Sequence, residues 1–160
     1  MGEFNLANLR LDGGDEEKVD FIVRTYNKSL KLLSMTFENK LTDNRISFDM
    51  FMILHFIDRA GEKRITLSEI ADKQEVTKSA ISRKVGTLLD LGYINQVNDS
   101  QDRRKKYLIL TKKGQKVYDK NRLIFEKMLN DVADQYGSED FTLTLQHINQ
   151  IVDIIKSTMN

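Results

Sequence analysis

Hydrophobic residues recur at every third or fourth position over most of this 160-residue chain, a spacing typical of amphipathic helices. The spacing predicts long helices over residues 15–41, 112–136 and 138–160. Thr111 is a suitable N-cap for the second of these helices, and Gly137 separates it from the third. We therefore expect a mainly α-helical fold. The apolar stripes of the three helices contain Val19, Ile22, Tyr26, Leu30, Leu33, Phe37 and Leu41; Val117, Ile124, Met128 and Val132; and Phe141, Leu145, Ile148, Val152, Ile155 and Met159.

The middle of the chain, residues 45–111, carries shorter and more varied patterns. Residues 48–57 are apolar at nearly every position, which predicts a helix buried on all sides that ends at Gly61. Thr66-Leu67-Ser68-Glu69 has the pattern of a capping box, so a short helix is expected to begin there. Just before it, Ile65 is expected to add a short strand.

A second short helix is expected to begin at Thr77, a favourable N-cap residue, and to extend to residue 91. Its apolar stripe contains Ala80 or Ile81, followed by Val85 and Leu88. In helix-turn-helix proteins the N-terminal end of such a helix contacts base edges in the major groove. The polar and cationic residues of its first two turns are therefore our candidate DNA contacts: Thr77, Lys78, Ser79, Ser82 and Arg83.

Two strand patterns follow, and together they predict a β-hairpin, or wing, over residues 94–110. The segment between the strands ends in four consecutive cations, from Arg103 to Lys106. Like charges at the surface repel about as strongly as an exposed ion pair attracts, so a structural role alone explains this run poorly. A polyanion would relieve the repulsion. The two short helices and the cationic hairpin together predict a winged helix that binds double-stranded DNA.

Four segments of this block follow one another in a characteristic order and at a characteristic spacing. They are Leu67-Ser68-Glu69-Ile70-Ala71, Thr77-Lys78-Ser79-Ala80-Ile81-Ser82-Arg83, Leu89-x-x-Gly92-Tyr93-Ile94, and Asp102-Arg103-Arg104 followed by Leu110-Thr111-x-x-Gly114. With these motifs the block from Leu67 to Thr111, about a third of the chain, resembles the multiple antibiotic resistance regulator (MarR) family of bacterial transcription factors.

The resemblance implies a homodimeric repressor that binds a pseudo-palindromic operator, with residues 15–41 and 112–160 forming the dimerisation helices. It further implies that Asp102 and Arg104 are structural in the wing, the arginine pairing with an acid. Arg103 is then the first candidate to enter the minor groove, with Arg104 and Lys105 beside it. The family often holds small lipophilic or phenolic effectors between its dimerisation helices and its winged helix, so such a ligand is expected here without named contacts.

Composition agrees with one domain over residues 15–160, preceded by residues 1–14, which lack a clear period and are expected to be disordered. The net charge is only +1, but residues 77–122 contain twelve Lys and Arg against four Asp. No apolar run approaches the ~20 residues of a membrane span, and no signal peptide is evident. We therefore expect a cytoplasmic protein that does not bind membranes.

The sequence offers little support for catalysis or for a cofactor. There is no Cys, which excludes disulfides and thiolate metal sites, and no nucleophile lies beside a base. His55 and His147 have no His or Cys partner at metal-ligand spacing. We therefore expect His55 to be a core or pocket residue and His147 to be a solvated helix residue. The protein is thus expected to be no enzyme and to need no cofactor or metal.

Two other interpretations stay open at this point. The protein could be an activator or architectural DNA-binding protein with no effector, or its winged helix could bind another protein. The cationic wing disfavours the second of these, since protein-binding surfaces tend to be depleted of lysine. The terminal helices could also pack on their own core, although so much amphipathic helix around a small core favours dimerisation.

Overall fold

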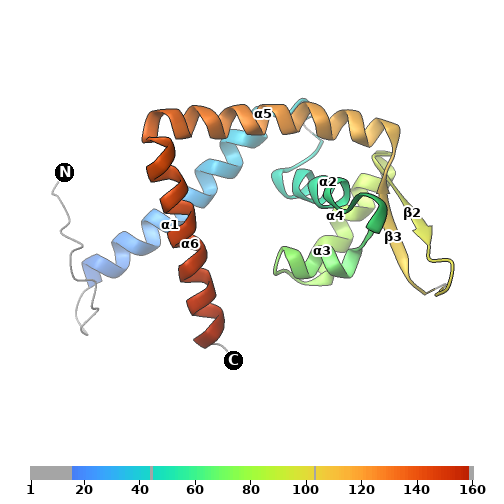
Figure 1. The fold of residues 1–160 in the computed structure, drawn as a ribbon, viewed down its shortest axis with the longest axis horizontal. Helices are drawn as coiled ribbons and strands as arrows, with labels where there is room; N and C mark the ends of the chain where they lie inside the picture. Colours follow the sequence, from blue (N-terminus) through green and yellow to red (C-terminus); the bar gives the residue numbers. More distant parts are fainter. Residues whose placement is uncertain (1–15, 44, 103, 159–160) are drawn as a thin grey trace.

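The computed structural model describes residues 16–43, 45–102 and 104–158. Figure 1 shows a lobe of short helices and a small sheet at one end of a long helix, with two more long helices toward its other end. The expectations for residues 1–14, Arg103 and Met159 lie outside the described residues, as do the side chains of Tyr26, Leu30 and Leu33. No helix in the described ranges is long and apolar enough to cross a membrane.

The lobe is a winged helix, as the sequence predicted. Its elements are α2 (Phe48–Ala60), the 3-10 turn η1 (Gly61–Lys63), β1 (Ile65–Thr66), α3 (Leu67–Lys73), α4 (Lys78–Asp90), β2 (Ile94–Asn98) and β3 (Lys106–Leu110). The long helices are α1 (Glu16–Glu38), α5 (Lys112–Tyr136) and α6 (Ser138–Thr158). From the lobe, α5 crosses the top of Figure 1 to reach α6.

Hydroxyl side chains begin the helices at the positions that the sequence predicted. Thr66 Oγ1 accepts from the Glu69 amide at 3.3 Å, and the Glu69 carboxylate accepts from the Thr66 amide at 2.7 Å, which completes the capping box. Thr77 Oγ1 caps α4 through the Ala80 amide at 3.3 Å, and Thr111 Oγ1 caps α5. These caps fix where α3, α4 and α5 start.

The sheet is antiparallel, in the order β1-β3-β2. Ile65 pairs with Leu108, and Ile94 pairs with Leu110. Ile65, Ile94 and Leu108 are all buried, so one face of the wing base packs on the lobe. The strand expected at Ile65 is confirmed, and it attaches the wing to the start of α3.

A cluster of aromatic side chains joins the lobe to the long helices. Phe37 of α1 is fully buried, and its ring centroid lies 4.9 Å from those of both Phe51 and Phe125. Phe51 also stacks on Tyr118 of α5, with 5.8 Å between ring centroids. Such ring pairs add to the stability that apolar burial supplies, so the C-terminal end of α1, α2 and α5 form one packed junction.

Three details differ from the sequence predictions. The first helix ends at Glu38 rather than residue 41, because the amides of Lys40 and Leu41 bond to carbonyls only three residues back. Helix α2 is not buried on all sides, since Asp49 is exposed. Val132, expected on a buried stripe, is 44% exposed because this part of α5 has passed beyond the lobe.

Candidate nucleic-acid interface

The first two turns of α4 present a polar, exposed surface above an apolar stripe. Ile81, Val85 and Leu88 are buried against the lobe, and Ala80 is only half-buried, so Ile81 holds the first position of that stripe. The five candidate contacts of this helix lie on the exposed side: Thr77, Lys78, Ser79, Ser82 and Arg83.

These five side chains are not equally available. The Thr77 hydroxyl accepts the capping bond and lies 3.0 Å from Ser79 Oγ, so Thr77 orients the helix end as well as facing solvent. Within the described chain, the side chains of Lys78, Ser82 and Arg83 form no hydrogen bond or ion pair. Their donors are therefore available to a partner such as a base edge or a phosphate.

Lys84 follows Arg83 in sequence but does not share this surface. Its ammonium nitrogen lies 2.5 Å from Asp49 Oδ2 of α2. This ion pair ties the middle of α4 to the helix beneath it. Sequence reasoning missed the pair, because nothing in the local pattern relates residues on two different helices.

Two aspartates shape the tip of the wing. Asp99 Oδ1 accepts from the amides of Gln101 and Asp102 at 2.7 and 2.9 Å, and these bonds lower the pKa of the Asp99 carboxyl. Asp102 Oδ1 accepts from the Arg104 amide at 3.0 Å and lies 3.6 Å from Arg104 Nε. Asp102 and Arg104 therefore contact each other within the turn, and their structural role in the wing stays a prediction. The role of Asp99 was missed, although Asn98-Asp99-Ser100 is a typical turn composition.

The cations of the wing face the start of α3 across a groove of about 480 Å³. The Arg104 side chain is 95% exposed, and Lys105 Nζ lies 5.0 Å from the centre of the Tyr107 ring. At the start of α3, the polar residues Thr66 and Ser68 line the same groove. Arg103, our first candidate for the minor groove, lies outside the described residues.

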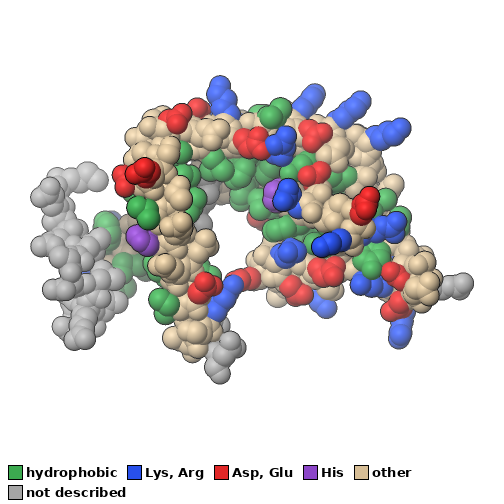
Figure 2. Space-filling model, viewed as in Figure 1, with side chains coloured by type: hydrophobic (Ala, Val, Ile, Leu, Met, Phe, Trp, Pro, Cys, Tyr) green, Lys and Arg blue, Asp and Glu red, His purple; other side chains and the backbone are tan. Residues whose placement is uncertain are grey.

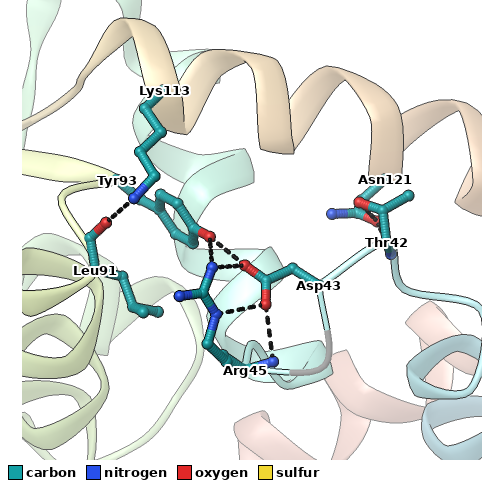
Figure 3. A network of polar contacts seen from close by, with 7 residues as sticks. All are labelled: Thr42, Asp43, Arg45, Leu91, Tyr93, Lys113 and Asn121. Carbon is teal, nitrogen blue, oxygen red and sulfur yellow. Dashed lines mark hydrogen bonds and ion pairs between the residues drawn. The ribbon is translucent and has the colours of Figure 1, made fainter.

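A polar network, drawn in Figure 3, holds the root of the wing against the linker between α1 and α2. Arg45 Nη2 donates to Asp43 Oδ2 and to Tyr93 Oη, both at 2.9 Å, and the Tyr93 hydroxyl donates to Asp43. The bonds from Arg45 and Tyr93 hold the pKa of the Asp43 carboxyl well below its ordinary range. The backbone amide of Thr42 donates to buried Asn121 Oδ1 of α5 at 2.9 Å. Of these residues only Tyr93 belongs to a motif of the sequence analysis, and none of these contacts was predicted there.

The wing root also explains one motif of the sequence. Gly114 lies in the first turn of α5, where a β-carbon would lie 1.8 Å from the backbone oxygen of Tyr93. Only a glycine lets the helix approach the strand this closely. The Leu-Thr-x-x-Gly spacing thus combines the Thr111 cap with this close approach.

The two histidines have different surroundings. His55 is partly buried with Nδ1 3.0 Å from the Tyr118 hydroxyl, and burial, reinforced by the charge of Arg59, lowers its pKa. His147 is exposed on α6. Among the residues that the structure describes, no group of three or more His, Cys, Asp and Glu side chains is placed to hold a metal ion.

Comparisons with known proteins agree with this architecture. Residues 46–105 match the model of the MarR family. The HTH-type transcriptional regulator TcaR of Staphylococcus aureus is 24% identical over 142 residues, which cover 88% of this chain and 89% of TcaR. The regulator BilQ of Clostridioides difficile is 22% identical over 138 residues, covering 86% of this chain and 90% of BilQ.

Solved structures show the same fold. AbsC, a MarR family regulator from Streptomyces coelicolor, has a TM-score of 0.76 at 19% identity and covers 92% of this chain and 99% of its own. MepR of S. aureus, in a crystal structure with DNA, has a TM-score of 0.73 at 19% identity. The match covers 84% of this chain and 96% of the MepR chain. The fold is that of a winged helix carried on long terminal helices. Residues 46–105 thus match the MarR family, and over most of its length the chain is similar to HTH-type transcriptional regulators.

Proposed function

We propose that the protein is a homodimeric repressor that binds a pseudo-palindromic operator in double-stranded DNA in the cytoplasm. The observation that carries the proposal is the exposed N-terminal face of α4, where Lys78, Ser82 and Arg83 have no partner within the described chain. Free donors at this end of a second helix are suited to major-groove edges. The wing, with Arg104 and Lys105 exposed, supplies charge beside them, and Arg103 is proposed to enter the minor groove.

The terminal helices support the dimer. Helix α6 (Ser138–Thr158) contains no buried residue, although its apolar side chains include Ile151 and Ile155, which are 56% and 51% exposed. Helix α1 likewise exposes Val19 and Ile22, and Figure 2 shows hydrophobic side chains at the surface of this end of the molecule. A second copy of the chain would cover these faces in a two-fold arrangement. The two recognition helices would then lie about 34–36 Å apart, one turn of DNA.

The relatives favour DNA over a protein partner. The solved structures of similar fold include a DNA complex of MepR and an operator DNA complex of a mutant of Escherichia coli MarR. The regulators among the curated relatives are not enzymes, and the same class is proposed for this chain.

A small lipophilic or phenolic effector completes the proposal. The aromatic junction of α1, α2 and α5 lies where a ligand could alter the angle between the lobe and the long helices, and Phe48 and Phe125 in it are only partly buried. Screening phenolic compounds by thermal shift, followed by titration of the protein–DNA complex, tests this part. An effector should both stabilise the protein and release it from DNA.

The main experiment selects bound sequences from random DNA and measures affinity by fluorescence anisotropy against salt. If about six to ten phosphates are neutralised per dimer, log K should fall with log salt at a slope of about −5 to −9. A slope near zero would exclude the cationic surface as the binding face. The selected site should contain two half-sites one turn apart, and a reporter placed behind it should be repressed. Activation of the reporter would instead support the alternative of an activator.

A further inference from the structure

A second group of cations surrounds a cavity of about 400 Å³ at the C-terminal end of α2, apart from the candidate contacts of α4 and the wing. Its lining residues come from the last turns of α2, from η1 and β1 with the residue between them, and from α3. Its lining includes one carboxylate, Glu69, and the apolar side chains Phe56, Ala60 and Ile65. The four cations around it are Arg59, Lys63, Arg64 and Lys73. Lys and Arg side chains are prominent on the face of the lobe that Figure 2 shows.

The four cations have no partner of their own. Within the described chain, none of their side chains forms an ion pair or a hydrogen bond, and the lining carries a net charge of +3. Helix dipoles account for two of them, because Arg59 and Lys73 lie in the last turns of α2 and α3. Lys63 and Arg64 lie beyond the end of α2, so their convergence on the same cavity needs another reason.

The backbone of Arg64 supplies a further indication. Its φ of 54° and ψ of 171° fall in a region that is essentially restricted to glycine. The Arg64 amide donates to the carbonyl of Gly61 at 3.1 Å, which holds the turn in this shape. A glycine at this position would remove the strain. An arginine in its place indicates that the guanidinium has a use.

We propose that this cavity binds a small phosphorylated compound with a planar ring, of the chemical class of the nucleoside diphosphates. Arginine presents paired donors that match phosphate oxygens, and the lysines add charge without a fixed geometry. Phe56 and Ala60, which are only partly buried, offer apolar surface on which a ring can pack. The volume falls within the range of small-molecule sites. A DNA backbone would use the cations but not the apolar wall, so a small ligand fits the whole lining better.

The test is isothermal titration calorimetry of the full chain with ADP, adenosine and inorganic pyrophosphate, in the absence of DNA. ADP should bind saturably at one site per chain, with adenosine and pyrophosphate each about tenfold weaker, since each uses half of the lining. Arg64→Gln and Lys63→Gln should each weaken ADP binding about fivefold or more. Arg64→Gly should weaken it equally while raising the melting temperature, because it relieves the strained backbone.

Lys127→Gln is the matched control, because Lys127 is exposed on α5 and is not among the residues that line the cavity. The substitution removes the same single positive charge. It should leave ADP affinity unchanged. Absence of saturable ADP binding up to millimolar concentration overturns the proposal, as does equal binding in Arg64→Gln and wild type. If pyrophosphate binds as tightly as ADP, the apolar wall contributes nothing to binding, and this result also overturns the proposal. If the cavity variants lower DNA affinity and ADP does not bind, the surface is a DNA contact and the proposal is wrong.

Discussion

The hydroxyl of Tyr93 donates a hydrogen bond to Asp43 from fifty residues away in the chain. Tyr93 lies between the end of α4 and the first strand of the wing, while Asp43 belongs to the linker that follows α1. Arg45 donates to both partners, so the three side chains form a closed polar group. The group joins the segment that would carry the dimer to the segment that would read DNA.

The first prediction concerns the pH dependence of this group. The pKa of Asp43 is depressed in the folded state, so its ionised carboxylate stabilises the fold above the ordinary carboxyl pKa of about 3.9. This stability is lost as the pH falls from there toward the folded-state pKa. Asp43→Asn should therefore cost about 1–3 kcal/mol at pH 7, measured by urea unfolding, and the deficit should shrink below pH 4.

Asp131→Asn provides the control for this experiment, because Asp131 is exposed on α5 and loses the same charge. It should change stability at pH 7 by less than about 0.5 kcal/mol. An Asp43→Asn deficit that stays constant from pH 7 to pH 3 would show that the carboxylate charge is not what stabilises the linker.

The second prediction uses two glycines with opposite surroundings. A β-carbon at Gly114 would collide with the Tyr93 carbonyl, whereas one at Gly86, in the middle of α4, would meet no atom within 4 Å. Gly114→Ala should destabilise the protein by about 1–3 kcal/mol or more through this overlap. Gly86→Ala should stabilise it by about 0.5–1 kcal/mol through helix propensity. Thermal unfolding of both variants gives the comparison, and equal shifts of one sign would contradict the close packing at Gly114.

Much of the lobe could be predicted from sequence because local signals decide it. The caps at Thr66, Thr77 and Thr111 are each made within three residues, so the sequence places these helix starts correctly. The apolar stripe of α4 also identifies which side remains exposed. The helix ends were less accurate, as at Glu38, where a tight turn rather than a periodicity change ends the helix.

The partners across the fold could not be predicted in the same way. Asn121 accepts from Thr42 across 79 residues, and Asp49 pairs with Lys84 on another helix. Such pairs depend on how helices pack, which no local pattern encodes. The cavity beside Arg64 was missed for the same reason, since its cations lie on α2, η1 and α3 and in the loop before β1. The functions of the exposed residues remain predictions, because exposure alone does not identify the partner.

The third prediction tests the dimer. Replacing Ile151 and Ile155 with Glu would place two charges in the interface that α6 is proposed to form, and an unpaired buried charge costs several kcal/mol. Sedimentation velocity should show a dimer for the wild type and a monomer for the double variant, with operator affinity lost. Gln146→Glu with Gln150→Glu adds the same charge to exposed polar positions of α6 and should remain dimeric. A wild-type monomer at micromolar concentration would rule out the two-fold operator model.

The last prediction separates the recognition helix from the wing. Arg83→Ala removes a free donor from the exposed face of α4, where a side chain that reaches a guanine edge gives about 1–3 kcal/mol of discrimination. This variant should lose preference for operator over random DNA. Arg103→Ala should instead weaken binding to both DNAs and make the salt slope shallower by about one unit, because a minor-groove arginine responds mainly to charge and groove width. Anisotropy titrations of both variants at several salt concentrations, with Lys127→Ala as the control, measure the affinity ratio and the slope together. If Arg103→Ala abolishes the ratio while Arg83→Ala preserves it, the wing rather than α4 reads the sequence.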